Sequence, residues 1–380
     1  MRKGAWILGV VLAVVAIAIV WLVVRPPRGQ GDARSIRVGA ISPFTGEGAR
    51  YGHAARTGID LAVDEINAKG GVKGAKILVQ YEDDRGNQAD AVSAFNKLVS
   101  VDRVPAVLGP FYSGNVLACA PIADRSKVVL LTGSATSDNV RGAGRYVFRV
   151  CPSNDEQART IADYAFKILR FRSAFVIYRN VDYGVTLRDA FDKAFKGAGG
   201  KIVGVEAVPA DAGDVRAQLT MVKQASPDFI FAAVHFPEGG VLLRQAKELG
   251  ITAAVMGTDG GHDPELLKIA GNAAEGSYWA TMGWGNESSN PAIAAFRAAY
   301  RLRFGEDPGV YSGLYYDATM VLAEALGKAE SIDDASIRAA LTESDYEGVT
   351  GRNRFDDRGD VTKPFAIYQV RNARFVPVSQ

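Results

Sequence analysis

Histidine and cysteine are scarce in this sequence, which restricts the chemistry that it can support. The 380 residues contain three histidines, His53, His235 and His262, and two cysteines, Cys119 and Cys151. No histidine has cysteine or carboxylate partners at the spacing of a metal site, and the H-E-x-x-H motif of zinc enzymes is absent. We therefore expect no metal site and no cofactor.

The two cysteines are expected to be buried free thiols. Cys119 falls in an apolar helical pattern and Cys151 at the end of an apolar strand, and free cysteine is among the most buried residue types. An oxidising compartment would also allow the two to form a disulfide, and the sequence leaves that alternative open.

Several catalytic and nucleotide-binding motifs are also missing. The sequence has no G-x-x-x-x-G-K-[ST] loop, no G-x-S-x-G turn, and no G-x-G-x-x-G between a strand and a helix. Its acidic pairs, Asp83-Asp84 and Asp356-Asp357, are adjacent residues that point in different directions, unlike the facing carboxylates of a glycosidase. We therefore expect a protein that is not an enzyme and has no catalytic residues.

The charge pattern does not suit a nucleic-acid partner. The chain carries 44 Lys and Arg residues against 42 Asp and Glu residues, and four of the basic residues lie in residues 1–30, which hold no acid. The rest is slightly acidic, and no basic stretch with interleaved aromatic residues follows residue 30. A content of 48% hydrophobic residues over this length predicts a globular α/β protein of about two domains.

The longest uncharged run lies at the N-terminus, where residues 5–24 follow Arg2-Lys3. A helix of that length spans about 30 Å, the thickness of the apolar core of a bilayer, and exceeds the roughly 7–15 apolar residues of a cleavable signal. No Ala-x-Ala cleavage site and no nearby cysteine for lipid attachment follow it. We predict that residues 1–34 form a membrane anchor, or a signal, with a short extended linker.

Apolar runs and helical patterns alternate along the chain, which predicts two lobes, each a mostly parallel sheet flanked by helices. In the first half, strands are expected at residues 36–42, 76–82, 105–109 and 128–131, and helices at 52–68, 88–101 and 113–124. After an extended run at 146–152, strands are expected at 174–178, 202–208, 229–234 and 253–257, and helices at 156–170, 183–198, 215–225 and 238–249.

The C-terminal part is expected to return to the first lobe and to end in the second. The three helical patterns that support this are at 291–304, 312–328 and 333–342, more than the second lobe needs. We infer a crossing near Met282 and another at 348–352, followed by hairpins at 351–360 and 365–376. The first lobe would hold residues 35–152 and 283–350, and the second residues 153–282 and 351–380.

Two loops of the first lobe carry small hydroxyl residues where ligands commonly bind. Ser113 lies where a helix begins after the strand at 105–109, and Ser134 and Thr136 follow the strand at 128–131. In an open α/β sheet, ligands bind beyond the carboxyl ends of the strands, where N–H groups lack partners. Hydroxyl and N–H donors suit a small carboxylate. The alternative is that these residues only cap helices and fill turns.

Four more polar residues are expected at the same edge of the two sheets: Tyr51, Tyr183, His235 and Asp259. Each alone fits a surface tyrosine, a hydrogen-bonded histidine or a helix-capping aspartate. Together they lie at the carboxyl ends of strands, where a cleft between the lobes would open.

Several motifs resemble the periplasmic leucine/isoleucine/valine-binding proteins, the substrate-binding proteins of branched-chain amino-acid ABC transporters. The most specific is DEINAKGGVKG at residues 64–74, with YEDD at 81–84. Further similar segments, in order along residues 36–378, are Leu108-Gly-Pro, Asp182-Tyr-Gly184, Leu243-Arg-Gln-Ala246 and Phe355-Asp with Gly359-Asp360. The resemblance implies a type I periplasmic-binding-protein fold with three crossovers that closes on its ligand.

The resemblance also implies residue roles. A serine at the position of Ser113 and a threonine at that of Thr136 hold the α-carboxylate of the ligand. The carbonyl of Ser134 and an acid at Asp259 take the α-ammonium, and Tyr51 and Tyr183 match aromatic walls. Two positions depart from the leucine-type pattern. Asp259 replaces a glutamate and is one methylene shorter, so the lobes must close slightly farther or a water must bridge the gap. His235 replaces a tyrosine, which argues against a branched aliphatic ligand side chain and could admit a polar one. The expected ligand-binding set is Tyr51, Ser113, Ser134, Ala135, Thr136, Tyr183, His235 and Asp259.

The expected function is that of an extracytoplasmic receptor that passes an α-amino acid to an ABC transporter permease. A membrane-tethered sensor is the alternative from another class, since the anchor is predicted to be retained. Amides or urea are alternative ligands of a receptor.

Overall fold

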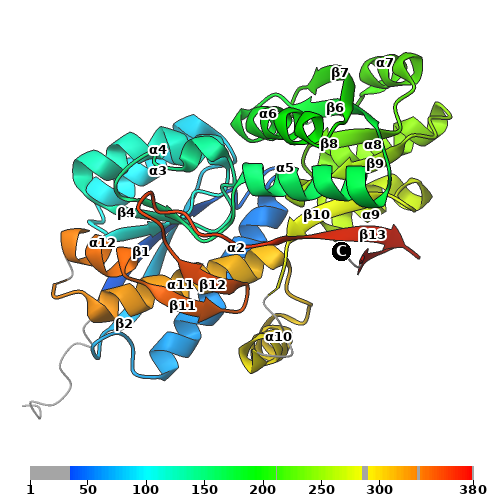
Figure 1. Ribbon diagram of the computed structural model, residues 1–380. Helices are drawn as coiled ribbons and strands as arrows, with labels where there is room; N and C mark the ends of the chain where they lie inside the picture. The colour runs from blue at the N-terminus through cyan, green and yellow to red at the C-terminus, as the bar shows by residue number, and fades with distance from the viewer. Residues whose placement is uncertain (1–34, 211, 285–289, 332–333, 379–380) are drawn as a thin grey trace, which may run out of the picture.

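The computed structural model describes residues 35–210, 212–284, 290–331 and 334–378, which form two α/β lobes side by side (Figure 1). The predicted anchor, residues 5–24, lies outside these residues and stays a prediction. Within the described part of the chain, none of the helices has both the length and the apolar character to cross a membrane.

The first lobe is built on a five-stranded parallel sheet in the order β2-β1-β3-β4-β5. Its strands are β1 (Ser35–Ser42), β2 (Lys76–Asp83), β3 (Ala106–Leu108), β4 (Val129–Thr132) and β5 (Val147–Arg149). The side chains of β4 alternate between two apolar clusters, with Val129 and Leu131 in one and Leu130 in the other. Both faces are therefore buried, as the continuous apolar runs predicted.

Helices cover both faces of this sheet. One face is packed by α2 (Ala49–Ala68), α11 (Val310–Lys328) and α12 (Asp334–Thr342), the other by α3 (Gln88–Ser100) and α4 (Ser113–Ser126). Helices α2 and α11 come unusually close at Gly58, because a Cβ atom there would lie 2.1 Å from the carbonyl oxygen of Ser312. Helix α10 (Pro291–Phe304) packs on α2. Three C-terminal helices therefore occur where they were predicted.

The second lobe is built on a seven-stranded sheet in the order β14-β13-β10-β9-β8-β6-β7. Its strands are β6 (Ser173–Arg179), β7 (Lys201–Val208), β8 (Phe229–Ala233), β9 (Ala254–Gly257), β10 (Tyr278–Met282), β13 (Phe365–Arg371) and β14 (Arg374–Pro377). Only the β10–β13 and β13–β14 pairs are antiparallel. One face is packed by α5 (Asn154–Asp163) and α6 (Asp182–Gly197), the other by α7 (Arg216–Ala225), α8 (Phe236–Glu248) and α9 (Pro264–Ala270).

The first predicted C-terminal hairpin is wrong in position. The hairpin consists of β11 (Asp345–Gly348) and β12 (Gly351–Arg354) rather than residues 351–360. Its turn is fixed by the buried carboxylate of Asp317, which accepts hydrogen bonds from the N–H groups of Val349 and Thr350, each at 2.9 Å. A contact with a distant helix therefore sets this turn. The second hairpin, which turns between Arg371 and Arg374, is confirmed.

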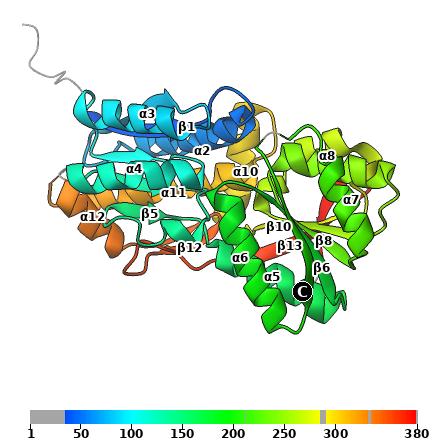
Figure 2. The same cartoon turned by 90° about the horizontal axis from the view of Figure 1, so that it is seen from above.

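The chain passes between the lobes after β5, after β10 and after β12 (Figure 2). After β12 it first runs beside β5, where the N–H of Arg149 donates to the carbonyl of Gly359 at 3.0 Å. The ring of Phe355 also packs edge-on against Phe148, with centroids 5.2 Å apart. Residues 355–360 therefore contact the first lobe before the third crossing.

Candidate ligand-binding cleft

The predicted hydroxyl residues of the first lobe lie together at one edge of its sheet. Ser113 is the first residue of α4, and Ser134, Ala135 and Thr136 lie in the loop after β4, all of them buried. The two loops are joined, because Ser113 Oγ accepts a hydrogen bond from the N–H of Ser137 at 3.2 Å. The neighbouring strands β3 and β4 are parallel, so their carboxyl ends place these loops side by side.

The helix-capping alternative does not account for these residues. The N-cap of α4 is Tyr112, which makes no side-chain cap bond, and the short helix at Asp138–Val140 is capped by Ser137. Thr136 is fully buried, and its Oγ1 has no hydrogen-bond partner among the described residues. A buried hydroxyl without a partner is rare in folded proteins.

Arg149 holds the loop from behind, a role that the sequence analysis missed. Its buried guanidinium donates to the carbonyls of Ala135 at 3.1 Å and Ser137 at 2.8 Å. It also forms a bidentate ion pair with Asp360, in which Nε donates to Oδ1 at 2.8 Å and Nη2 to Oδ2 at 2.6 Å. Because C=O and N–H point in opposite directions across a trans peptide, the bond to Ala135 directs the N–H of Thr136 away from Arg149. An arginine inside the apolar run at 146–152 was the signal in the sequence.

The predicted residues of the second lobe also gather at strand ends. Tyr183 lies in the first turn of α6, His235 is the N-cap of α8, and Asp259 begins the short helix at Asp259–Gly261 after β9. These elements follow β6, β8 and β9, which are neighbours in the sheet. All three side chains are buried, and the hydroxyl of Tyr183 donates to Asp259 Oδ1 at 2.8 Å.

The two groups meet across a closed interface between the lobes. From α11 of the first lobe, the hydroxyl of Tyr311 donates to Asp259 Oδ2 at 3.0 Å. The hydroxyl of Tyr51 in α2 donates to the carbonyl of Gly260 at 2.5 Å. The ring of Tyr112, next to Ser113, stacks on His235 with centroids 5.3 Å apart.

Tyr112 and Tyr311 were also missed by the sequence analysis. Tyr311 lies in a helix far along the chain from every other member of the site, and no local motif marks it.

Burial shifts the pKa values of the ionisable groups in this interface. The pKa of Asp259 is raised, mainly by burial, although hydrogen bonds from Tyr183 and Tyr311 act in the opposite direction. Burial also raises the pKa values of both tyrosines. The pKa of His235 is lowered well below its usual value by burial and by the charge of Arg179. His235 is therefore neutral at neutral pH, and Asp259 lacks the stabilisation that a nearby cation would give.

Thr136 is not the only residue here with a buried polar atom that lacks a partner among the described residues. Others are the Nδ1 atom of His235 and the amide of Gln157, which faces Asp259 without a hydrogen bond of normal geometry. Gln157 lies on α5, whose Asn154 N–H donates to the carbonyl of Thr136 at 2.8 Å. Unpartnered polar atoms therefore occur in both lobes at this interface, as expected of a site for a polar ligand.

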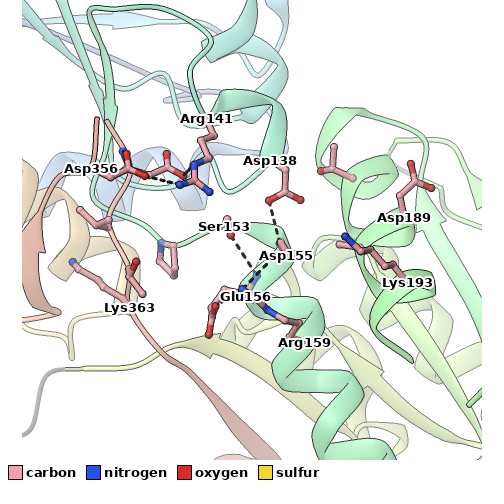
Figure 3. A pocket seen from close by; sticks show the side chains of 16 residues that line it. Asp138, Arg141, Ser153, Asp155, Glu156, Arg159, Asp189, Lys193, Asp356 and Lys363 are labelled. Carbon is pink, nitrogen blue, oxygen red and sulfur yellow. Dashed lines mark hydrogen bonds and ion pairs between the residues drawn. The ribbon is translucent and has the colours of Figure 1, made fainter. Parts of the chain in front are cut away.

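A polar cavity of about 540 Å³ lies beside the crossing segments (Figure 3). Arg141 and Asp356 are paired at 2.6 Å on one side of it, and Asp189 and Lys193 of α6 face them from the other. Because the walls come from both lobes, motion at the crossings must change the shape of this cavity.

Cys119 and Cys151 are both free and buried, so the prediction of two thiols is confirmed. Burial raises the pKa of each to about 12. Within the described ranges, no group of three or more His, Cys, Asp and Glu residues could hold a metal ion.

Comparison with known proteins gives consistent matches over nearly the whole body of the chain. A family model described as periplasmic binding protein matches residues 35–374. The Leu/Ile/Val-binding protein BraC3 of Rhizobium johnstonii is 32% identical over 347 residues, which cover 90% of this chain and 93% of that protein.

Solved structures give the same result. The branched-chain amino-acid transporter substrate-binding protein LivJ of Streptococcus pneumoniae, in complex with isoleucine, has a TM-score of 0.85 at 30% identity and covers 91% of this chain and 99% of its own. A solute-binding protein of Rhodopseudomonas palustris, in complex with 3,4-dihydroxybenzoic acid, has a TM-score of 0.82 at 26% identity, with 91% and 96% covered. These relatives are solute-binding proteins of transporters and not enzymes. The chain therefore belongs to the periplasmic binding protein family, in the group of the leucine/isoleucine/valine-binding proteins.

Proposed function

We propose that this protein captures an α-amino acid between its lobes and presents it to the permease of an ABC transporter. Membership of the periplasmic binding protein family implies that the body of the chain lies outside the cytoplasm. One observation carries the choice of ligand. The closed interface has an unpartnered buried hydroxyl at Thr136 on one side and, on the other, the buried Asp259 without a cation among the described residues.

A zwitterion supplies what each side lacks. Its carboxylate would accept from the hydroxyls of Ser113 and Thr136 and from the N–H that Arg149 directs away from itself. Its ammonium would lie between Asp259 and the carbonyl of Ser134. The positive charge would then lower the raised pKa of Asp259, because a nearby cation favours the ionised carboxylate.

The side chain of the ligand would meet the aromatic part of the cleft. Tyr51, Tyr183 and the neutral His235 would line it, and Ala135 would form the backbone wall between Ser134 and Thr136. Among the relatives described above, BraC3 is named as a Leu/Ile/Val-binding protein, and the Rhodopseudomonas palustris protein was solved with 3,4-dihydroxybenzoic acid. We propose an amino acid with an uncharged side chain, because His235 is neutral at neutral pH.

Lobe closure would follow from contacts that exist only when both lobes engage the ligand. We propose the lobe division predicted from the sequence, 35–152 with 283–350 and 153–282 with 351–380. The contacts of residues 355–360 with β5 favour one change to this division, in which the last segment of the first lobe ends after Asp360 instead of at residue 350.

The test is a ligand screen followed by two substitutions in the full-length protein, purified in a mild detergent. Common amino acids, amides and urea are screened for a rise in melting temperature, because a ligand that binds only the folded state stabilises it. With the best ligand, Asp259→Ala should weaken binding by about 30-fold or more in calorimetry, since a buried charge loses its partner. Tyr51→Phe should cost less than about tenfold, because it removes one neutral hydrogen bond. Small, equal effects would contradict the ammonium assignment.

The uncharged run at residues 5–24 favours a second candidate, a tethered sensor whose ligand changes its association with a partner. Cell fractionation separates the two candidates when combined with the genetic neighbourhood. Recovery in the membrane fraction without an adjacent permease gene supports the sensor, and a permease gene beside it supports the transport receptor.

A further inference from the structure

A second cavity, of about 250 Å³, lies beside the cleft and shares two of its walls, Tyr51 and Tyr311. The first lobe contributes α2 and the loop before α11 to this cavity. The second lobe contributes His262, Thr281 of β10 and the β13–β14 hairpin. The cavity thus lies between the lobes without containing Ser113, Thr136, His235 or Asp259.

Two polar side chains that line this cavity have no hydrogen-bond partner among the described residues. Thr281 is 2% exposed and its Oγ1 is unpartnered. His262 is only half-buried, but its Nε2 atom is itself buried and also unpartnered. Leaving a buried polar group unsatisfied costs about 1–3 kcal/mol, so two of them beside one cavity need an explanation. A ligand that hydrogen-bonds to both would provide it.

The remaining walls are aromatic. The lining includes six aromatic side chains, Tyr51, Trp284, Tyr300, Tyr311, Tyr368 and Phe375. The His262 ring itself packs against Phe375, with centroids 4.1 Å apart. Aromatic walls around a small number of polar groups favour a planar ring. The volume lies below the roughly 300–1,000 Å³ of drug-sized sites, and so suits one or two rings.

The ionisable residues around the cavity already have partners. Arg50 pairs with Asp263 at 2.5 Å, and the Nε2 atom of His53 contacts Glu306 at 2.9 Å. Asp307 pairs with Arg301 outside the lining. Burial lowers the pKa of His262 to about 4, so that this imidazole is neutral. A charged ligand would therefore have to compete with these existing contacts, whereas an uncharged one would not.

We propose that this cavity is a second ligand site, which takes a small uncharged aromatic molecule with one hydroxyl or N–H group, such as a phenol or an indole. The polar group hydrogen-bonds with Thr281 and His262, and the ring lies against the aromatic walls. The occupant also contacts Tyr51 and Tyr311, which hold Gly260 and Asp259 of the cleft. Its binding is therefore coupled to closure, and the two ligands strengthen one another's binding.

The test uses phenol and indole as probes with the full-length protein in detergent. Calorimetry on the wild type is compared with Thr281→Val and His262→Phe, which keep the shape of each side chain but remove the hydrogen bond. Each variant should lose several-fold, up to about tenfold, in probe affinity, because each removes one neutral hydrogen bond. The double variant should lose more, and the binding that remains in it measures partition of the probe into micelles. Thr319→Val is the matched control, since this buried threonine of α11 donates to the carbonyl of Tyr315 away from the cavity. It should bind the probes as the wild type does.

Absence of probe binding to the wild type at millimolar concentration would overturn the proposal, as would equal binding by all variants. Crystals grown with a probe that show only water in the cavity would do the same. The site itself does not depend on the proposed function, because no amino acid enters these measurements. Only the coupling depends on it, and there the probe should bind more tightly in the presence of the cleft ligand.

Discussion

Arg149 binds two separate segments, the loop at 134–137 and Asp360, which ends the segment that contacts β5 before the third crossing. Arg149→Met would leave a carboxylate that is 8% exposed without its main partner. We expect a loss of about 3 kcal/mol in the free energy of unfolding, measured with urea. The matched variant Arg141→Met changes a side chain that is 49% exposed. It removes ion pairs with Asp356 at 2.6 Å and with Asp360 at 3.6 Å, and should cost less than about 1 kcal/mol. Equal losses would mean that the Arg149 pair contributes no more than a surface one.

Asp259 should make ligand affinity depend on pH. Burial raises its pKa in the free protein, so this carboxyl takes up a proton as the pH falls through that raised value, whereas the ammonium of the ligand requires the ionised form. The groups that face it, Tyr183 and Tyr311, stay neutral because their pKa values are raised. Affinity for an amino acid should therefore fall on acidification from neutral pH.

The stability of the free protein should respond in the opposite sense at this residue, because a group whose folded-state pKa is raised favours folding as it becomes protonated. Calorimetry over a pH series checks the ligand effect, with Asp259→Asn as the variant that should lose it. A slope that persists in Asp259→Asn would assign the pH dependence to another group.

Residues at strand ends could be predicted, because parallel strands bring their carboxyl ends to one edge whatever the details of the packing. Ser113, Thr136, His235 and Asp259 share that property, and the structure gathers them. Tyr311 could not be found in this way, since it enters the site from a helix that returns to the first lobe.

At the level of the elements, the close contact between α2 and α11 depends on the glycine at position 58, which has no side chain. Gly58→Ala would place a methyl group 2.1 Å from the carbonyl oxygen of Ser312, where backbone must move to make room. We expect a loss of about 1–3 kcal/mol in the free energy of unfolding. Gly197→Ala in α6 is the control, because its new methyl group meets no atom within 4 Å. Alanine is the better helix former by up to about 1 kcal/mol, so this variant should be stabilised. A stable Gly58→Ala protein would show that the two helices can separate at no cost.

Most elements could be predicted because each lobe repeats one unit, an apolar strand followed by an amphipathic helix. The failures occur where that local pattern gives way to long-range contacts. The turn of β11–β12 is set by Asp317, 32 residues before Val349. The segment of α9 and β10 was left unassigned, although Trp279 of β10 is fully buried. Its indole lies where any side chain at Gly257 or Gly261 would stand, with a Cβ at either position within 2.0 Å of the ring.

For the whole molecule, the described contacts that join the lobes include two that lie on the surface. These two are the ion pair of Arg50 with Asp263 at 2.5 Å and the hydrogen bond from Asn139 to Asp182 at 2.8 Å. Removing both with Arg50→Ala and Asn139→Ala should favour the open form, because each contact requires closure. Each partly exposed contact contributes up to about 1 kcal/mol, so ligand affinity should fall by up to about fivefold per contact.

Small-angle scattering with and without ligand checks this expectation, since the ligand-free variant should have the larger radius of gyration. Lys196→Ala is the control, because its ion pair with Asp192 lies within α6 and does not join the lobes. If the variant and the wild type scatter alike without ligand, these contacts do not determine closure.

The contacts of Arg149 with the loop at 134–137 and with Asp360 also restrict how this sequence can diverge. A neutral residue at position 360 would leave the buried guanidinium of Arg149 without its carboxylate. A neutral residue at position 149 would leave the carboxylate of Asp360 with the longer contact, at 3.6 Å, to the more exposed Arg141. Either single step is costly, whereas exchanging both for well-packed apolar residues can be nearly neutral. Homologous chains should therefore change these two positions together, and a coordinated exchange at 149 and 360 would mark those in which the loop at 134–137 and the segment that leads into the third crossing have become independent.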